Sequence, residues 1–225
     1  MHFKAILFDL DGTLLDTLDD IASSVDEVLL KNDLPTHSLD DYRSFISDGI
    51  SMLIMRSLPK DRRDEQTISK CVKEFQKAYG LNWNNRTQPY EGVIETLGEL
   101  AAHGLILGII SNKSHDFTIK CVDTFLPDIK FDFVLGLQEG IPPKPDPTGA
   151  NSFSEKMGIP PEQILFVGDS GTDVKTAVAA GMFPVGVLWG FKSLAELRDS
   201  GARELIEHPK EILLILKKLI PKICN

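Results

Sequence analysis

The sequence predicts an α/β fold, in which a doubly wound parallel sheet forms the core and an all-helical domain is inserted into it. Short apolar runs alternate with helical patterns along most of the 225 residues. Such alternation is typical of βαβ units, and continuously apolar strands are typical of a parallel sheet that is covered on both faces. About ninety residues separate the first run from the second, whereas a simple crossover needs only a few dozen.

Five apolar runs, rich in Ile, Val, Leu and Phe, are the candidate strands of this Rossmann-like core. Helical stripes between them end at Gly104 and Gly181, where glycine is a natural C-terminal cap. An amphipathic pattern from Pro209 to Ile220 predicts a closing helix. The candidate strands are Ala5–Phe8, Leu105–Ile110, Phe131–Leu135, Ile164–Val167 and Val185–Leu188.

The inserted segment is predicted to be helical over residues 16–87, so that 1–15 and 88–225 form the core. Thr17 to Asp20 has the spacing of a capping box, and apolar residues at helical spacing follow from Leu18 to Leu29. Further helical patterns cover 39–57 and 64–80. Two short connections, near residues 16 and 88, would act as hinges between insert and core.

Composition and charge limit the classes of function. The net charge of −9 argues against a general nucleic-acid surface, because phosphate backbones are bound by clustered Lys and Arg. No apolar stretch approaches the roughly 20 residues that span a bilayer. The amino-terminal residues do not fit a signal peptide, so a cytoplasmic location is expected. The cysteines, Cys71, Cys121 and Cys224, fit neither a disulfide framework nor a zinc site, and Cys71 and Cys121 belong to apolar helical stripes.

Polar residues with catalytic chemistry gather where the candidate strands end. Ligands of an open parallel sheet bind beyond the carboxyl ends of its strands. Four carboxylates at the carboxyl ends of neighbouring strands would repel each other unless a cation is present. Oxygen ligands together with a phosphate favour Mg²⁺, and the substrate is then expected to be a small phosphorylated metabolite. The residues concerned are Asp9, Asp11, Ser111, Asn112, Lys113, Lys144, Asp169, Ser170 and Asp173.

These residue types support phosphoryl transfer through a covalent intermediate. An aspartate can attack phosphorus to form an aspartyl phosphate, and a second acid two residues later can move the proton. Ser111 and Lys144 would hold the phosphoryl oxygens. Gly12 would let exposed backbone N–H groups approach the phosphate.

In order along the chain, these motifs resemble the four motifs of the haloacid dehalogenase-like hydrolases. They are Asp9-Leu10-Asp11-Gly12-Thr13-Leu14, Ser111-Asn112-Lys113, Lys144 before Pro145, and Gly168-Asp169-Ser170-Gly171-Thr172-Asp173. The resemblance implies that Asp9 is the nucleophile and Asp11 the general acid and base. It also implies that Asp9, the backbone carbonyl of Asp11, and Asp169 hold Mg²⁺ with support from Asp173, and that the insert is a helical cap.

Within that superfamily the chain looks most like the phosphoglycolate phosphatases. The resemblance rests on Tyr90-Glu91-Gly92-Val93, on the cap segment Phe45–Ile50 and on Ser111-Asn112-Lys113 after the second strand. It implies substrate contacts for Asp48 and Gly49, and Ser47 stands where those enzymes often have Gly. A β-phosphoglucomutase-like isomerase is the alternative, although no Arg follows Gly49 in that segment. A non-catalytic phosphate-binding module is a remote one. A monomer or a homodimer is expected.

Overall fold

The core is a six-stranded parallel sheet with its first strand in the middle. The computed structural model of the chain describes residues 3–219. The strand order is β5-β4-β1-β6-β7-β8, so the chain builds one side of the sheet outward from β1 and then the other. The strands are β1 (Ala5–Phe8), β4 (Ile106–Ser114), β5 (Phe133–Leu137), β6 (Ile164–Gly168), β7 (Phe183–Val187) and β8 (Glu204–Ile206).

Helices cover both faces of the sheet, because successive side chains of a buried strand point to opposite sides. In β1, Ile6 and Phe8 join one apolar cluster, whereas Ala5 and Leu7 join another. The first cluster includes residues of α5 (Val93–Ala102), α6 (His115–Phe125) and α10 (Glu211–Leu219). The second includes α7 (Thr148–Met157) and α8 (Gly171–Ala179), while α9 (Leu194–Asp199) packs near β7 and β8.

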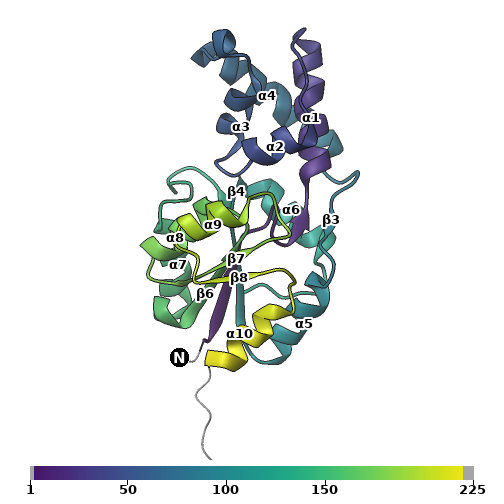
Figure 1. Cartoon of the computed structure of the whole chain (residues 1–225). Helices are drawn as coiled ribbons and strands as arrows, with labels where there is room; N and C mark the ends of the chain where they lie inside the picture. Colours follow the sequence, from purple (N-terminus) through teal and green to yellow (C-terminus); the bar gives the residue numbers. More distant parts are fainter. Residues whose placement is uncertain (1–2, 220–225) are drawn as a thin grey trace, which may run out of the picture.

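A helical unit, made of α1 to α4, lies over the carboxyl ends of the strands (Figure 1). Its helices share an apolar cluster of their own, separate from the two clusters of the sheet. The short antiparallel pair of β2 (Leu15–Asp16) and β3 (Gln88–Pro89) lies at its junction with the core. The helices are α1 (Leu18–Lys31), α2 (Leu39–Phe45), α3 (Ile50–Ser57) and α4 (Glu65–Asn82), and 3₁₀ turns occupy Lys60–Arg62 and Pro161–Gln163.

The predicted α/β class and parallel sheet are confirmed, with shifts at the ends of several strands. All five candidate strands are present, but β4 continues through Ser114. The pattern over 39–57 is divided between α2 and α3, and β8 was not predicted because its three residues carry no distinctive pattern. Gly104 and Gly181 follow their helices with positive φ, as expected. The last residue of the predicted closing helix, Ile220, lies outside the described residues.

The predicted capping box at Thr17 and Asp20 is wrong. Thr17 is the residue before α1, but its side chain makes no capping hydrogen bond. The carboxylate of Asp20 instead accepts hydrogen bonds from the backbone N–H groups of Arg86 and Thr87, at 2.9 to 3.0 Å. Asp20 therefore joins the start of α1 to the segment that follows α4, instead of taking part in a capping box with Thr17.

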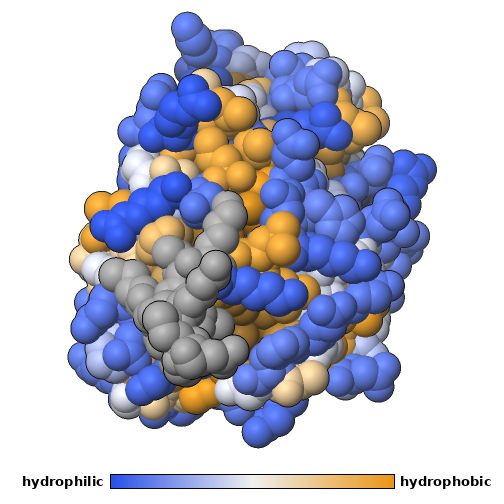
Figure 2. Space-filling model, turned by 60° about the horizontal axis from the view of Figure 1, so that its bottom comes forward, coloured by the Kyte–Doolittle hydropathy of each residue, from blue (hydrophilic) through white to orange (hydrophobic). Residues whose placement is uncertain are grey.

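The described cysteines are buried, and no described helix could cross a membrane. Cys71 and Cys121 are buried free thiols, and burial raises the pKa of Cys121 to about 11. Cys224 lies outside the described residues. No helix within residues 3–219 is long and apolar enough to cross a membrane. In the view of Figure 2, hydrophilic residues surround a smaller band of hydrophobic ones.

Candidate active site

The candidate active site lies between the carboxyl edge of the sheet and the helical unit. A cavity of about 210 Å³ is lined by residues from both parts. Asp9 reaches it from the end of β1, and Asp169 from the residue after β6. The strand order reverses beside β1, so the cavity occupies the place where open parallel sheets bind ligands.

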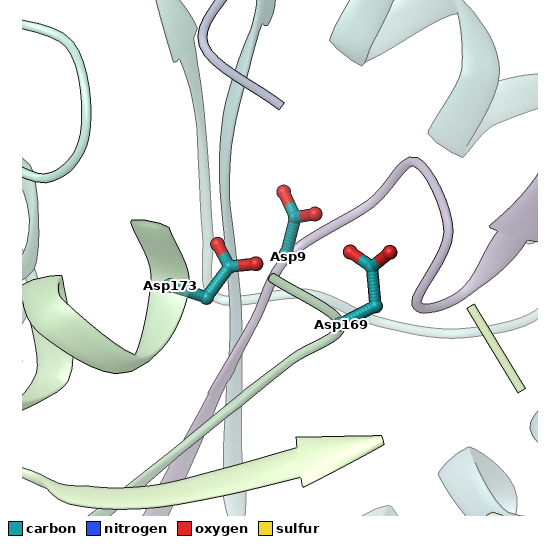
Figure 3. Close-up of side chains that lie close together, drawn as sticks. All are labelled: Asp9, Asp169 and Asp173. Atoms are coloured by element: carbon teal, nitrogen blue, oxygen red, sulfur yellow. The ribbon is translucent and has the colours of Figure 1, made fainter. Parts of the chain in front are cut away.

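Three buried carboxylates form the centre of the site. Asp9, Asp169 and Asp173 each offer an oxygen atom, and these atoms lie within 4.8 Å of one another (Figure 3). Burial, followed by the charge of Asp173, raises the pKa of Asp9 to about 7. Burial and the same neighbour also raise the pKa of Asp169 well above its ordinary value. Ionised carboxylates at this spacing repel each other unless a cation lies between them. The three carboxylate oxygens therefore fit a hard divalent metal ion.

Lys144 supplies positive charge inside this cluster. Its Nζ lies 2.6 Å from Asp9 Oδ1 and 2.6 Å from Asp173 Oδ1, and it donates to the carbonyl of Ile110 at 3.1 Å. Burial lowers the pKa of Lys144, but the two carboxylates outweigh burial and raise it above its ordinary value. One buried ammonium group therefore faces three carboxylates, so a deficit of positive charge remains.

Local hydrogen bonds orient the carboxylates that follow β6. Asp169 Oδ2 accepts from the backbone N–H of Phe191 at 2.7 Å. Asp173 Oδ2 accepts from the backbone N–H and the hydroxyl of Ser170, which completes a capping box at the start of α8. Asp173 thus has two roles, because one oxygen caps the helix and the other contacts Lys144.

Asp11 is held by Lys113, to which sequence reasoning assigned no role of its own. Lys113 Nζ lies 2.9 and 3.2 Å from the two carboxylate oxygens of Asp11. The same ammonium lies 4.7 Å from the centre of the Tyr79 ring, which belongs to α4. Burial lowers the pKa of Lys113, but Asp11 and, after it, Tyr79 together outweigh burial and raise it. The only sequence signal for this pair was the position of Lys113 beside Ser111 and Asn112.

Ser111 and Asn112 both line the cavity, but their surroundings differ. The Ser111 hydroxyl accepts a hydrogen bond from the backbone N–H of Lys113 at 3.2 Å. The amide of Asn112 accepts from the N–H of Lys144 at 2.8 Å and donates to the Lys144 carbonyl at 3.0 Å. It also donates to the Ser47 carbonyl at 3.1 Å. Asn112 therefore positions the Lys144 loop and a loop of the helical unit.

The structure places Gly12 differently from the expectation. Its N–H donates to the carbonyl of Leu15 at 2.8 Å, so it is not free to approach a phosphate. A Cβ atom at this position would lie 2.5 Å from Asp169 Oδ2. The backbone has a φ of +87°, which glycine adopts readily. Glycine is needed here because the carboxylate of Asp169 approaches so closely.

Asp48 is also placed differently, whereas Gly49 does line the cavity. The Asp48 carboxylate accepts from the hydroxyl of Thr172 at 2.9 Å and from Arg56. Burial raises the pKa of Asp48, but these bonds outweigh burial and lower it. Asp48 thus links the helical unit to α8 and is not among the residues that line the cavity, whereas its neighbours Ser47 and Gly49 are.

Known proteins resemble this chain along nearly its whole length. The family model for the haloacid dehalogenase-like hydrolases matches residues 6–187. A phosphoglycolate phosphatase from Mannheimia succiniciproducens is 34% identical over 222 residues, which cover 96% of this chain and 99% of the relative. A second, from Pseudomonas syringae pv. tomato, is 32% identical over 97% of this chain and 79% of its own length.

A solved structure supports the same assignment. A predicted phosphoglycolate phosphatase from Haemophilus somnus superimposes with a TM-score of 0.88 at 32% sequence identity. The match covers 96% of this chain and 98% of that one. The chain therefore belongs to the haloacid dehalogenase-like hydrolases, in the subgroup of phosphatases that are similar to phosphoglycolate phosphatase.

Proposed function

We propose that this enzyme is a Mg²⁺-dependent phosphatase, which hydrolyses a small phosphate monoester through an aspartyl phosphate on Asp9. The observation that carries the proposal is the buried cluster of Asp9, Asp169 and Asp173 around the ammonium of Lys144. Asp9, Asp169, Asp173 and the backbone carbonyl of Asp11 would hold the ion. When bound, Mg²⁺ would offset the charge of the carboxylates and of the phosphoryl oxygens.

Two aspartates divide the chemistry of the reaction. A carboxylate oxygen of Asp9 attacks phosphorus, and the bond between phosphorus and the ester oxygen breaks. The leaving oxygen takes its proton from Asp11, which later removes a proton from the attacking water. That water displaces Asp9 from phosphorus and releases inorganic phosphate. Lys113 contacts the carboxylate of Asp11 and so fixes its position beside the cavity.

The other residues of the cavity bind and position the phosphoryl group. The Ser111 hydroxyl and the Lys144 ammonium are the donors available beside Asp9. Asn112 holds the Lys144 loop in place. We further propose that residues 16–87 form the cap domain, because its helices supply the upper walls of the cavity. Its closure would exclude bulk water during the reaction.

Phosphoglycolate is the first substrate to test, because the two relatives compared above are phosphoglycolate phosphatases. A phosphoryl-transfer isomerase such as β-phosphoglucomutase must grip a second phosphate, and the residues that line the cavity include no arginine. A non-catalytic binding module is disfavoured because both Asp9 and Asp11 are present at the cavity.

Replacement of Asp9 by Asn is the direct test of the covalent mechanism. Asp9→Asn is expected to lower turnover of phosphate monoesters in Mg²⁺ by at least about a thousandfold, because the amide is not a nucleophile. Thermal unfolding would verify that the variant folds. Asp123→Asn, an exposed position on α6, is the matched control and should retain full activity. A fully active, folded Asp9→Asn enzyme would exclude the mechanism.

A further inference from the structure

The cavity has two chemically different halves. Its floor carries the carboxylates and lysines at the edge of the sheet. Its upper walls are mostly apolar side chains from α1, α3, α4 and the loop before α3, together with side chains of the core. Phe75 stacks on Tyr79 with their ring centres 5.4 Å apart and an interplanar angle of 9°. The apolar lining residues are Ile21, Ile46, Ile50, Leu53, Phe75, Phe117 and Leu137.

Among the lining residues, the positive charges all belong to the floor and are already paired. They are the ammonium groups of Lys113, bonded to Asp11, and Lys144, bonded to Asp9 and Asp173. The nearby guanidinium of Arg56 does not line the cavity, because it donates to Asp48 and to the carbonyl of Phe45. An anionic group above the phosphate site would therefore meet no free cation among these residues.

The apolar walls favour an uncharged, apolar organic group of the substrate over an anionic one. Ser47 and Gln76 also line the cavity, and these neutral side chains can form hydrogen bonds. They would not neutralise a second negative charge, and a charge beside apolar walls loses hydration without compensation. An apolar group at the same place gains free energy in proportion to its buried area.

We infer that the preferred substrate is a phosphate monoester whose organic group is uncharged and apolar, aromatic or branched. The inference rests on the proposed phosphatase function and specifies its substrate class. It sets this enzyme apart from its named relatives, because the glycolate part of phosphoglycolate carries a carboxylate. The floor of the cavity determines the reaction, and the walls that α3 and α4 supply determine which ester enters.

The test compares benzyl phosphate with 2-phosphoglycolate, since both release a primary alcohol and differ in the group beyond it. With the wild-type enzyme and Mg²⁺, kcat/KM for benzyl phosphate should be higher by at least about tenfold. An equal or higher kcat/KM for 2-phosphoglycolate overturns the inference, yet leaves the proposed phosphatase function intact.

A charge added to the wall should reverse the preference. Ile50, at the start of α3, is half-buried and lines the cavity, so a longer side chain can be tolerated there. Ile50→Arg should lower kcat/KM for benzyl phosphate and raise it for 2-phosphoglycolate by about tenfold or more. Ile50→Gln, which is polar but uncharged, should lower the first without raising the second. A failure of Ile50→Arg to shift the ratio while the variant remains folded counts against the inference.

Binding of non-hydrolysable analogues tests the walls independently of turnover. By calorimetry in the presence of Mg²⁺, 2-phenylethylphosphonate should bind at least about tenfold more tightly than 3-phosphonopropionate. If neither these two esters nor any other phosphate monoester is hydrolysed, the proposed function fails, and the ratio of the two affinities still decides the preference of the cavity. Equal affinities, or tighter binding of 3-phosphonopropionate, overturn the inferred preference for an apolar group.

Discussion

The side chain of Lys144 balances much of the negative charge in the active site. It is buried and contacts the carboxylates of both Asp9 and Asp173 at 2.6 Å. Removal of one partner from a buried ion pair leaves an uncompensated charge, which is more destabilising than loss of the pair as a whole. The ammonium of Lys144 is therefore expected to contribute to folding as well as to the phosphate binding proposed for it.

Replacement of Lys144 by Met should destabilise the metal-free enzyme. In EDTA, Lys144→Met is expected to lower the free energy of unfolding by about 3–5 kcal/mol, because two buried carboxylates lose their counter-charge. Excess Mg²⁺ should raise the melting temperature of this variant more than that of the wild type, since no lysine or arginine of residues 3–219 other than Lys144 is paired with these carboxylates. Denaturant and thermal unfolding, with and without Mg²⁺, measure both effects.

A surface lysine provides the control. Lys130 pairs with Asp132 at 3.1 Å but is almost fully exposed, so Lys130→Met should change the free energy of unfolding by less than about 0.5 kcal/mol. A Lys144→Met enzyme as stable as the control in EDTA would contradict the role given to the buried ammonium.

At the scale of elements, β5 and α6 approach so closely at Gly136 that no side chain fits between them. A Cβ atom there would lie 2.4 Å from Thr118 Oγ1, 2.6 Å from His115 Cα and 2.7 Å from the Lys113 carbonyl oxygen. Two of these are backbone atoms, which cannot rotate away. The Lys113 carbonyl belongs to β4, and the same end of β4 carries Ser111, so this close packing lies beside the candidate active site.

Two glycine substitutions are expected to have opposite effects on stability. Gly136→Ala should lower the free energy of unfolding by about 1–3 kcal/mol, because the added methyl group forces the helix away from the strand. Gly98→Ala, inside α5, meets no atom within 4 Å and should raise it by about 0.5–1 kcal/mol through helix propensity. Chemical denaturation of both variants measures these changes, and equal effects of the same sign would refute the argument from close approach.

At the scale of the molecule, side-chain hydrogen bonds at three places within residues 3–219 join the helical unit to the core. Thr172 donates to Asp48 at 2.9 Å, and Asn112 donates to the Ser47 carbonyl at 3.1 Å. Lys192 Nζ donates to the carbonyls of residues 43 and 44 at 2.8 and 2.9 Å. These contacts close the cavity over the carboxylates, so their loss is expected to favour an open arrangement.

Removal of the Thr172 hydroxyl should shift the molecule toward that open arrangement. One hydrogen bond contributes about 0.5–1.5 kcal/mol, so Thr172→Val should increase the open population by about two- to tenfold. Fluorophores attached through Lys60→Cys, in the helical unit, and Glu162→Cys, in the core, would report the distance. Mg²⁺ with orthovanadate should shorten that distance in the wild type.

Thr172→Ser keeps the hydroxyl and is the control for this experiment. It should behave as the wild type does, whereas Thr172→Val should need more orthovanadate to reach the short distance. Identical distance distributions in Thr172→Val and Thr172→Ser would mean that the bond to Asp48 does not hold the unit closed.

Taken by itself, the sequence determined the fold class and the convergence of the main acidic residues. Continuous apolar strands require a sheet covered on both faces, and parallel strands bring their carboxyl ends to one edge. Asp9 and Asp169 follow the ends of two such strands, so they were expected to meet there, whereas the loop residue Lys144 was placed beside them only by the resemblance to known motifs. Local patterns alone suffice for such an argument.

Only the tertiary structure decided which partners these side chains have and what the walls of the cavity are made of. The pairing of Lys113 with Asp11, the link from Thr172 to Asp48 and the Asp20 contacts that replaced a capping box each join distant segments. The apolar residues above the phosphate site look, in the sequence, like any buried helical stripe. Whether such a stripe faces a neighbouring helix or a cavity depends on how whole elements pack, and no local periodicity records that packing.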